Sequence, residues 1–312
     1  MADISGAIAS MVALLLLAVL GFIAAKLGYL NKENRKGISA LLLNVTLPCT
    51  ILASVSSMDS ESGAGLIVTA FVLAIVMFAL MSAAGAFCNV VLRVPKNQRH
   101  LYLFMSVFSN VGFIGIAVVS SVYGASAAFL GSIFLAVFNL LFYSVGINFT
   151  LLVSAEGNRP KFNPKSLISA PLIASIVAIV LFFSGIELPG FLNQAISLGG
   201  AVTAPVAMML VGLSVELANL RTVFSEWRLY AFTLLRYLVL PALAFLIARI
   251  FVQDAMILGV FTLMLAMPVG SLASAFAAGY NQDPLLPAKG IIVTTLASFI
   301  IIPVLIAFMA FV

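Results

Sequence analysis

The chain has 312 residues, of which 63% are hydrophobic and only 8% are charged, and its mean hydropathy is +1.24. This much apolar surface excludes a soluble globular domain of that length and indicates an all-α polytopic membrane protein. The net charge of +5 does not indicate a nucleic-acid partner, because the basic residues are spread over alternate loops between apolar segments.

Ten apolar segments follow one another, each long enough to cross the roughly 30 Å hydrocarbon core of a bilayer as a helix. We predict membrane spans at residues 5–28, 38–57, 64–91, 101–123, 126–153, 167–186, 196–216, 229–251, 255–280 and 288–311. The first segment is expected to remain as a helix, because it lacks the basic region that precedes the apolar part of a signal peptide.

The loops between these spans alternate in charge. The odd-numbered loops carry the basic residues Lys26, Lys32, Arg35, Lys36, Arg93, Lys96, Arg99, Arg159, Lys161, Lys165, Arg221, Arg228 and Lys289. The even-numbered loops carry the acids Asp59, Glu61, Glu187 and Asp254, with Arg249 as the one base nearby. The positive-inside rule therefore predicts that the odd loops are cytoplasmic and that both termini lie outside the cytoplasm.

The spans divide into two halves, residues 1–154 and residues 167–312, joined by a polar cytoplasmic linker at 155–166. Thr46-Leu47-Pro48 in span two matches Thr203-Ala204-Pro205 in span seven. Asn110 in span four and Pro268 in span nine are separated by the same chain distance to within one residue. Five spans per half predict a 5+5 inverted repeat, a common plan of secondary transporters, whereas chance matches between short patterns are the alternative.

Spans four and nine are each interrupted near their middle, so we predict a broken helix in both. Each second half-helix then begins inside the membrane with free N–H groups, and the two electropositive ends face one another at a site suited to a carboxylate. We expect this substrate site to include Ser109, Asn110, Gly112, Pro268, Gly270 and Ser271, with Ser274 as a further donor. The alternative for Gly112, Gly115 and Gly270 is that small residues allow close helix packing.

Other polar residues lie near span centres. We expect Asn44, Thr46, Pro48, Thr203 and Pro205 to line the same cavity; the alternative is a proline kink in which the threonine bonds back to its own helix. For Asn139 in span five, an interhelical hydrogen bond is favoured over contact with substrate.

Two charged residues are possible charge partners of the substrate. Arg236 lies about 12 Å into the apolar run that follows Arg228, and its charge must snorkel, pair or face water. Snorkelling toward the cytoplasmic face is favoured, whereas attraction of the anion is the alternative. Glu216 at the end of span seven is expected to form an interfacial salt bridge, with transfer of a coupling proton as the alternative.

The sequence gives no indication of an enzyme. The lone histidine, His100, lies in a basic loop, and no acidic residue occupies a span centre. GxGD, HExxH and GxxxxGK[ST] patterns are absent, so intramembrane proteolysis and direct use of ATP are not expected. Cys49 and Cys88 fall within spans and form no metal-ligand pattern. We predict no cofactor and no metal, and coupling to a proton or to sodium stays open.

The motifs resemble those of the auxin efflux carrier family, the bacterial relatives of the plant PIN carriers. Asn44, Leu47 and Pro48 match the family's span-two pattern within LLNVTLPCTIL. Asn110, Gly112, Phe113 and Gly115 match its span-four pattern within SNVGFIGIA, in which the late proline is absent and Ala117 lies near its expected place.

This resemblance implies a scaffold domain of spans 1, 2, 6 and 7 and a transport domain of spans 3–5 and 8–10, in a fold related to the bile acid sodium symporters. It also implies a homodimer in the bacterial inner membrane that moves organic anions such as malate, malonate or auxin-like acids. The function we expect is secondary active transport of such an anion by alternating access. A sodium-coupled symporter of the bile acid type, or a passive anion channel or sensor of the same fold, is the alternative.

Overall fold

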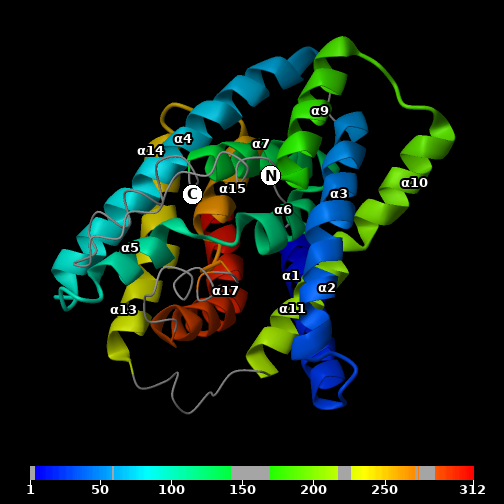
Figure 1. The fold of residues 1–312 in the computed structure, drawn as a ribbon. Helices are drawn as coiled ribbons and strands as arrows, with labels where there is room; N and C mark the ends of the chain where they lie inside the picture. Colours follow the sequence, from blue (N-terminus) through cyan, green and yellow to red (C-terminus); the bar gives the residue numbers. More distant parts are fainter. Residues whose placement is uncertain (1–3, 58–59, 142–168, 217–225, 271–272, 274–284) are drawn as a thin grey trace.

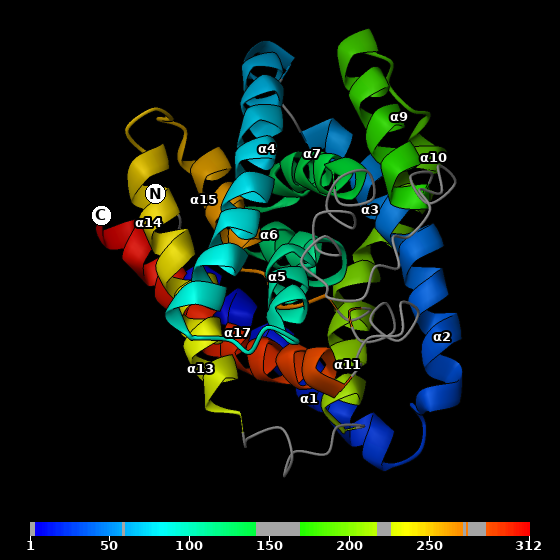
Figure 2. The same ribbon diagram turned by 60° about the vertical axis from the view of Figure 1, so that its left-hand side comes forward.

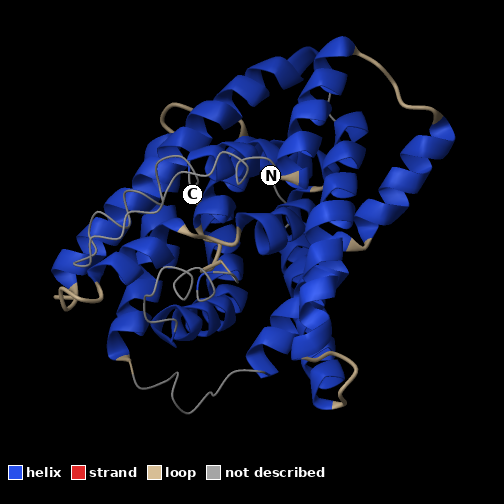
Figure 3. Cartoon of the chain, viewed as in Figure 1, coloured by secondary structure: helices blue, strands red, loops and turns tan. Residues whose placement is uncertain are grey.

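The computed structural model describes residues 4–57, 60–141, 169–216, 226–270, 273 and 285–312. Among these residues the regular structure is helical throughout, as Figure 3 shows, apart from an isolated antiparallel bridge between Ser109 and Val269. The all-α prediction is therefore confirmed for this part of the chain.

The first half contains α1 (Ile4–Lys26), α2 (Lys32–Leu41), η1 (Leu42–Thr46), α3 (Leu47–Ala53), η2 (Ser54–Ser57), α4 (Ser60–Val91), α5 (Arg99–Val107), η3 (Val111–Gly115), α6 (Ile116–Tyr123) and α7 (Ala125–Leu141). The second half contains α9 (Ala170–Ser184), α10 (Gly190–Ala201), α11 (Thr203–Glu216), α13 (Trp227–Leu234), η6 (Leu235–Val239), α14 (Leu240–Ala248), α15 (Ala255–Leu265) and α17 (Leu285–Phe311).

Six helical stretches are long and apolar enough to cross a membrane: Ala9–Lys26, Lys32–Ala53, Gly65–Val91, Gly190–Glu216, Trp227–Phe251 and Leu285–Phe311. Four shorter apolar helices accompany them, at Val111–Tyr123, Ala125–Leu141, Ala170–Ser184 and Ala255–Leu265. Each of the ten predicted segments overlaps one of these helices. The chain is a polytopic membrane protein, as its composition predicts.

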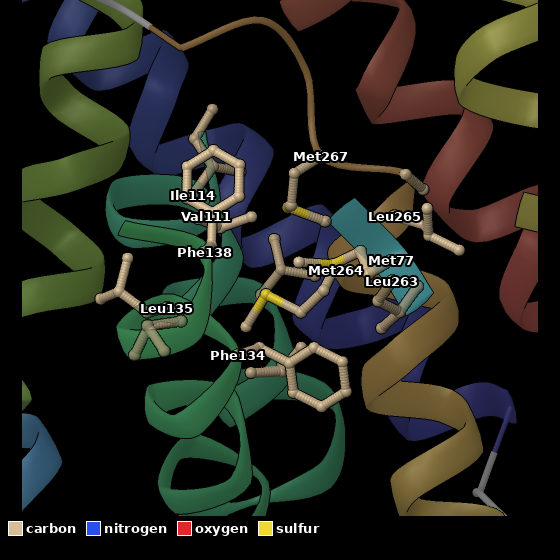
Figure 4. Close-up of a cluster of buried hydrophobic side chains, with 14 of the residues drawn as sticks. Met77, Val111, Ile114, Phe134, Leu135, Phe138, Leu263, Met264, Leu265 and Met267 are labelled. Atoms are coloured by element: carbon tan, nitrogen blue, oxygen red, sulfur yellow. The ribbon is translucent and has the colours of Figure 1, made fainter. Parts of the chain in front are cut away.

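The helices gather in two groups with α6 and α7 between them (Figures 1 and 2). In one group α1 packs along α11, and α3 packs against α9 and α10. In the other, α4 packs against α5, α7 and α15, and α14 packs against α15 and α17. Figure 4 shows the apolar contact between α15 and the α6–α7 region, where the fully buried Met264 lies. Flexible methionine side chains fill irregular gaps of this kind.

The contact between α1 and α11 depends on two glycines. A Cβ atom added to Gly212 would meet backbone atoms of Ala18 and Phe22, and one added to Gly21 would meet the backbone of Met209. The two helices thus touch backbone to backbone. Small residues allow this approach, which provides dispersion contacts that lipid cannot replace.

Gly212→Ala is expected to force α1 and α11 apart and to lower the free energy of unfolding by about 1–3 kcal/mol, the usual effect of overpacking. Thermal unfolding in detergent measures it. Gly65→Ala in α4 is the matched control, because a Cβ there meets no atom within 4 Å. Equal melting temperatures for both variants would contradict the close contact.

Candidate functional site

The two predicted helix interruptions lie against each other. The segment after α5 runs antiparallel to the segment after α15, with the bridge between Ser109 and Val269 at its centre. Asn110 N donates to Pro268 O at 2.8 Å, and Gly270 N donates to Phe108 O at 2.6 Å. Each interruption thereby gives hydrogen-bond partners to backbone groups of the other. In an apolar interior such groups cannot stay unpaired without a large cost. We call this pair of segments the crossing.

Asn110 begins the second half-helix of span four. Its Oδ1 accepts a hydrogen bond from Phe113 N at 3.2 Å, and its carbonyl accepts one from Gly115 N at 3.0 Å. The side chain is therefore an N-cap, which satisfies one of the unpaired N–H groups at a helix start. Among the described residues no acceptor is recorded for its Nδ2. Asn110 is buried but borders two cavities, so its amide can still donate to a ligand.

Arg236 binds the C-terminal ends of α5 and α15, the two half-helices that precede the crossing. Its side chain is fully buried, and Nε and Nη2 donate to Ser106 O at 3.1 and 2.8 Å. Nη1 donates to Leu265 O at 2.9 Å, so one guanidinium binds the last turns of both α5 and α15. Unpaired carbonyls at a helix C-terminus favour a cation in this way. Snorkelling, which the sequence favoured, is therefore wrong, because Nε, Nη1 and Nη2 all find acceptors inside the protein.

Two contacts fix the guanidinium further. Nε also donates to Ser106 Oγ at 2.9 Å, and the guanidinium carbon lies 4.8 Å from the centre of the Tyr237 ring. The Tyr237 hydroxyl donates a hydrogen bond to Met105 O at 2.9 Å, and this carbonyl also lies near the end of α5. No carboxylate pairs with Arg236 within the described chain, so the positive charge stays at the crossing.

Arg236 lies in a π-helical turn, and a similar turn occurs in span two. η6 (Leu235–Val239) is followed by Leu240-Pro241, and η1 (Leu42–Thr46) is followed by Leu47-Pro48. Proline lacks an N–H and clashes with the carbonyl four residues earlier, and one wider turn relieves that clash. The sequence comparison missed this likeness because it paired Pro48 with Pro205.

A cavity of about 790 Å³, open-solvent space included, lies beside the crossing. Three asparagines line it: Asn44 from the π-turn of span two, Asn110 from the crossing and Asn139 from α7. Ser109, Gly112 and Gly270 also border it. We call it the asparagine cavity; its amides can donate hydrogen bonds to an oxyanion.

Two further cavities adjoin the same helices. The arginine cavity extends from Asn110 and Phe113 to Arg35 and Ser39 on α2, along one face of α11. The threonine cavity lies between α3, α10 and α6 and is lined by Thr50, Ser120 and Thr203, among others. Cavities thus lie on more than one side of the half-helix that Asn110 caps.

Comparison with known proteins identifies the class of this molecule. Residues 7–161 and residues 150–306 match the family described as membrane transport protein. The chain belongs to the membrane transport protein family. This is the auxin efflux carrier family that the motifs resemble, so the predicted family is confirmed. The protein is a membrane transporter and not an enzyme.

Uncharacterized transporters from three organisms are similar to this chain. An uncharacterized transporter of Methanocaldococcus jannaschii is 26% identical over 302 residues, which cover 92% of this chain and 94% of the relative. One from Methanothermobacter thermautotrophicus is 22% identical over 305 residues, covering 96% and 97%. One from Saccharomyces cerevisiae is 30% identical over 107 residues, covering 33% of this chain and 18% of the relative.

The structure separates the polar residues that the sequence placed in one transporter cavity. Asn44 reaches the asparagine cavity, whereas Thr203 lines the threonine cavity and its hydroxyl lies 2.7 Å from Thr50 Oγ1. Thr46 is buried and bonds back to Leu42 O at 3.4 Å. Thr46, Pro48 and Pro205 line none of the three cavities, so the single common cavity is wrong.

The crossing glycines differ in what surrounds them. Gly112 has open space, with Leu135 Cδ1 the nearest atom to an added Cβ at 3.5 Å. A Cβ at Gly115 would lie 2.9 Å from Met264 Sδ, and one at Gly270 would overlap the Phe108 ring. Close packing therefore explains Gly115 and also Gly270, which in addition borders the cavity. Ser271 and Ser274 lie outside the described residues.

Three further expectations can be compared with the structure. Glu216 forms an ion pair with Lys26 at 3.5 Å, so the expected interfacial salt bridge is confirmed. Asn139 makes no interhelical side-chain hydrogen bond to a described residue and borders the cavity instead. His100 is not in a loop; it lies in the first turn of α5 and is buried, because the helix begins at Arg99.

Arg236→Lys is expected to destabilise the transporter by about 3 kcal/mol, because an ammonium cannot bind Ser106 O and Leu265 O together and leaves a buried carbonyl unpaired. Thermal unfolding of the purified protein measures the loss. The control is Arg249→Lys, whose one recorded side-chain contact among described residues is with the Phe245 ring. Similar melting temperatures for both variants would contradict the bridging role.

Proposed function

We propose that this protein is a secondary transporter that moves a small organic anion, a carboxylate such as malate, malonate or an auxin-like acid, by alternating access. The observation that carries the proposal is the capped half-helix start at Asn110, which borders the asparagine cavity beside the charge of Arg236. N–H groups at a helix start and a nearby cation both favour an anion.

The substrate carboxylate is placed in the asparagine cavity. The amides of Asn44, Asn110 and Asn139 supply donors that are neutral, so they bind an oxyanion without a fixed counter-charge at the binding point. Leu47, Leu135 and Phe138 supply apolar walls that can contact the carbon skeleton of the substrate. Of the serine, threonine and proline residues that the sequence predicts for the substrate site, Ser109 borders this cavity and stays in the proposed site.

The moving parts follow from the helix groups. Spans 1, 2, 6 and 7 form the proposed scaffold, supported by the contacts of α1 with α11 and of α3 with α9 and α10. Spans 3–5 and 8–10 form the proposed transport domain, which carries the crossing. Both the asparagine and the threonine cavity lie where α3 faces the α6–α7 region, so movement along this boundary would open one at the expense of the other.

The arrangement of ten spans as a 5+5 inverted repeat, with the linker at 155–166 and both termini outside the cytoplasm of a bacterial inner membrane, belongs to the same proposal. The paired interruptions support the repeat, since each half contributes one of them. Homodimer formation stays a prediction, and the coupling ion stays open.

Counterflow tests the carrier mechanism. Proteoliposomes loaded with unlabelled malate are expected to accumulate labelled malate transiently faster than empty ones, because the carrier returns loaded. Malonate and indole-3-acetate are tested in parallel. Equal uptake by loaded and empty vesicles, together with an ohmic current, would indicate a passive channel; uptake that requires sodium would indicate a symporter.

Asn110→Asp separates helix capping from substrate binding. Aspartate caps a helix about as well as asparagine, so folding is retained, but its charge repels a carboxylate. Malate flux is expected to fall at least about ten-fold, since like charges about 5 Å apart interact by more than 1 kcal/mol even at intermediate dielectric. Asn110→Ser, an uncharged cap, is expected to keep more flux than Asn110→Asp.

The matched control for this series is Asn31→Asp. Asn31 caps α2 through Glu33 N and Asn34 N, at 3.0 and 2.9 Å, on the exposed surface away from the crossing. At saturating malate, flux by this variant is expected to equal that of the original chain. Unchanged flux in Asn110→Asp would remove Asn110 from the substrate site.

A further inference from the structure

Arg35 forms no ion pair with an acid in the part of the chain that the structure describes. It is half-buried near the start of α2, where it borders the arginine cavity. The two ion pairs between described residues are Lys26 with Glu216 and Lys289 with Glu226. A cation that has lost part of its hydration without gaining a partner is stabilised by any anion that enters the cavity.

Neighbouring acids do not neutralise this charge. Glu216, at the end of α11, is engaged by Lys26 at 3.5 Å. Glu33 is exposed, on the first turn of α2, and forms no ion pair in the described structure. The mouth of the cavity is therefore electropositive.

The arginine cavity leads from Arg35 to the substrate site. Its wall on α11 consists of Ala207, Leu210, Val211, Ser214 and Val215, whose spacing puts them on one helix face over about 12 Å. Ser39 lies one turn after Arg35 on α2 and borders the same space. At the other end the cavity reaches Asn110, the residue that also borders the asparagine cavity.

The distance between Arg35 and the asparagine cavity decides the role of Arg35. Arg35 and Asn44 lie on the same span, and the helical rise puts them about 13 Å apart along its axis. This backbone separation exceeds the length of malonate or malate, so the start of α2 lies outside the space that a substrate among the asparagines would fill. Arg35 is therefore placed ahead of the substrate site and outside it.

We propose that Arg35 is an anion-capture residue, a weak first carboxylate site in an entry vestibule that supplies the crossing. This assignment rests on the proposed function for the nature of the substrate. A cation in a narrow, low-dielectric mouth raises the local concentration of anions and the rate at which they enter, and salt weakens the effect.

The transport test uses labelled malate in inside-out membrane vesicles, which present the proposed cytoplasmic face. Arg35→Gln is expected to raise KM roughly five- to ten-fold and to leave the maximal rate within about two-fold, because the site itself is intact. Arg35→Lys is expected to retain most of the affinity. The KM of the original chain is expected to rise with ionic strength, and that of Arg35→Gln to change little.

Lys36→Gln is the matched control, since it removes the same charge from the exposed neighbouring position. An equal rise in KM for Lys36→Gln and Arg35→Gln would indicate a general effect of surface charge and not a specific site at Arg35. A fall in maximal rate without a change in KM would make Arg35 a structural residue. Either result overturns the proposal.

A second experiment needs no transport. Ser39→Cys, in a chain with Cys49→Ala and Cys88→Ala, is labelled with an anionic and with a cationic methanethiosulfonate reagent. Adding Arg35→Gln is expected to slow the anionic reagent roughly three- to ten-fold and not to slow the cationic one. Equal slowing of both, or of neither, overturns the vestibule. An Arg35-dependent anionic rate in a chain that moves no carboxylate would overturn the proposed function alone.

Discussion

The fold of this transporter depends on the need to satisfy backbone groups where two helices stop inside an apolar interior. α5 and α15 both end beside Arg236, whose buried guanidinium donates hydrogen bonds to the carbonyls of Ser106 and Leu265. The extended segments then pair with each other through Asn110 and Pro268. Without these bonds, several peptide groups would be buried unpaired, at a cost of about 1–3 kcal/mol each.

The helix ends at the crossing find different hydrogen-bond partners. The C-terminal ends are bound by a fixed cation, whereas the N-terminal end at Asn110 is only partly satisfied, by a neutral amide that borders two cavities. Carbonyl oxygens solvate the charge of Arg236 but do not cancel it. The crossing therefore keeps a positive charge close to Asn110, which supports the proposal that the substrate is an anion.

Sequence reasoning was accurate for residues whose role follows from their own position in a span. Asn110 and Pro268 interrupt apolar runs, and these interruptions meet as expected. It failed for Arg236 because depth alone cannot tell a snorkelling arginine from one that caps two other helices. It also failed for Thr203, since a likeness to Thr46 in sequence does not put both side chains on the same cavity.

By itself the sequence determined that the chain spans a membrane and where its helices are interrupted, because apolar length, charge alternation and helix-breaking residues act locally. Only the tertiary structure decided that Arg236 binds the ends of α5 and α15, that three asparagines border one cavity, and that Arg35 borders another without an ion pair to any described acid. These features join residues far apart in the chain. Their geometry is set by how the helices pack, and no local pattern encodes it.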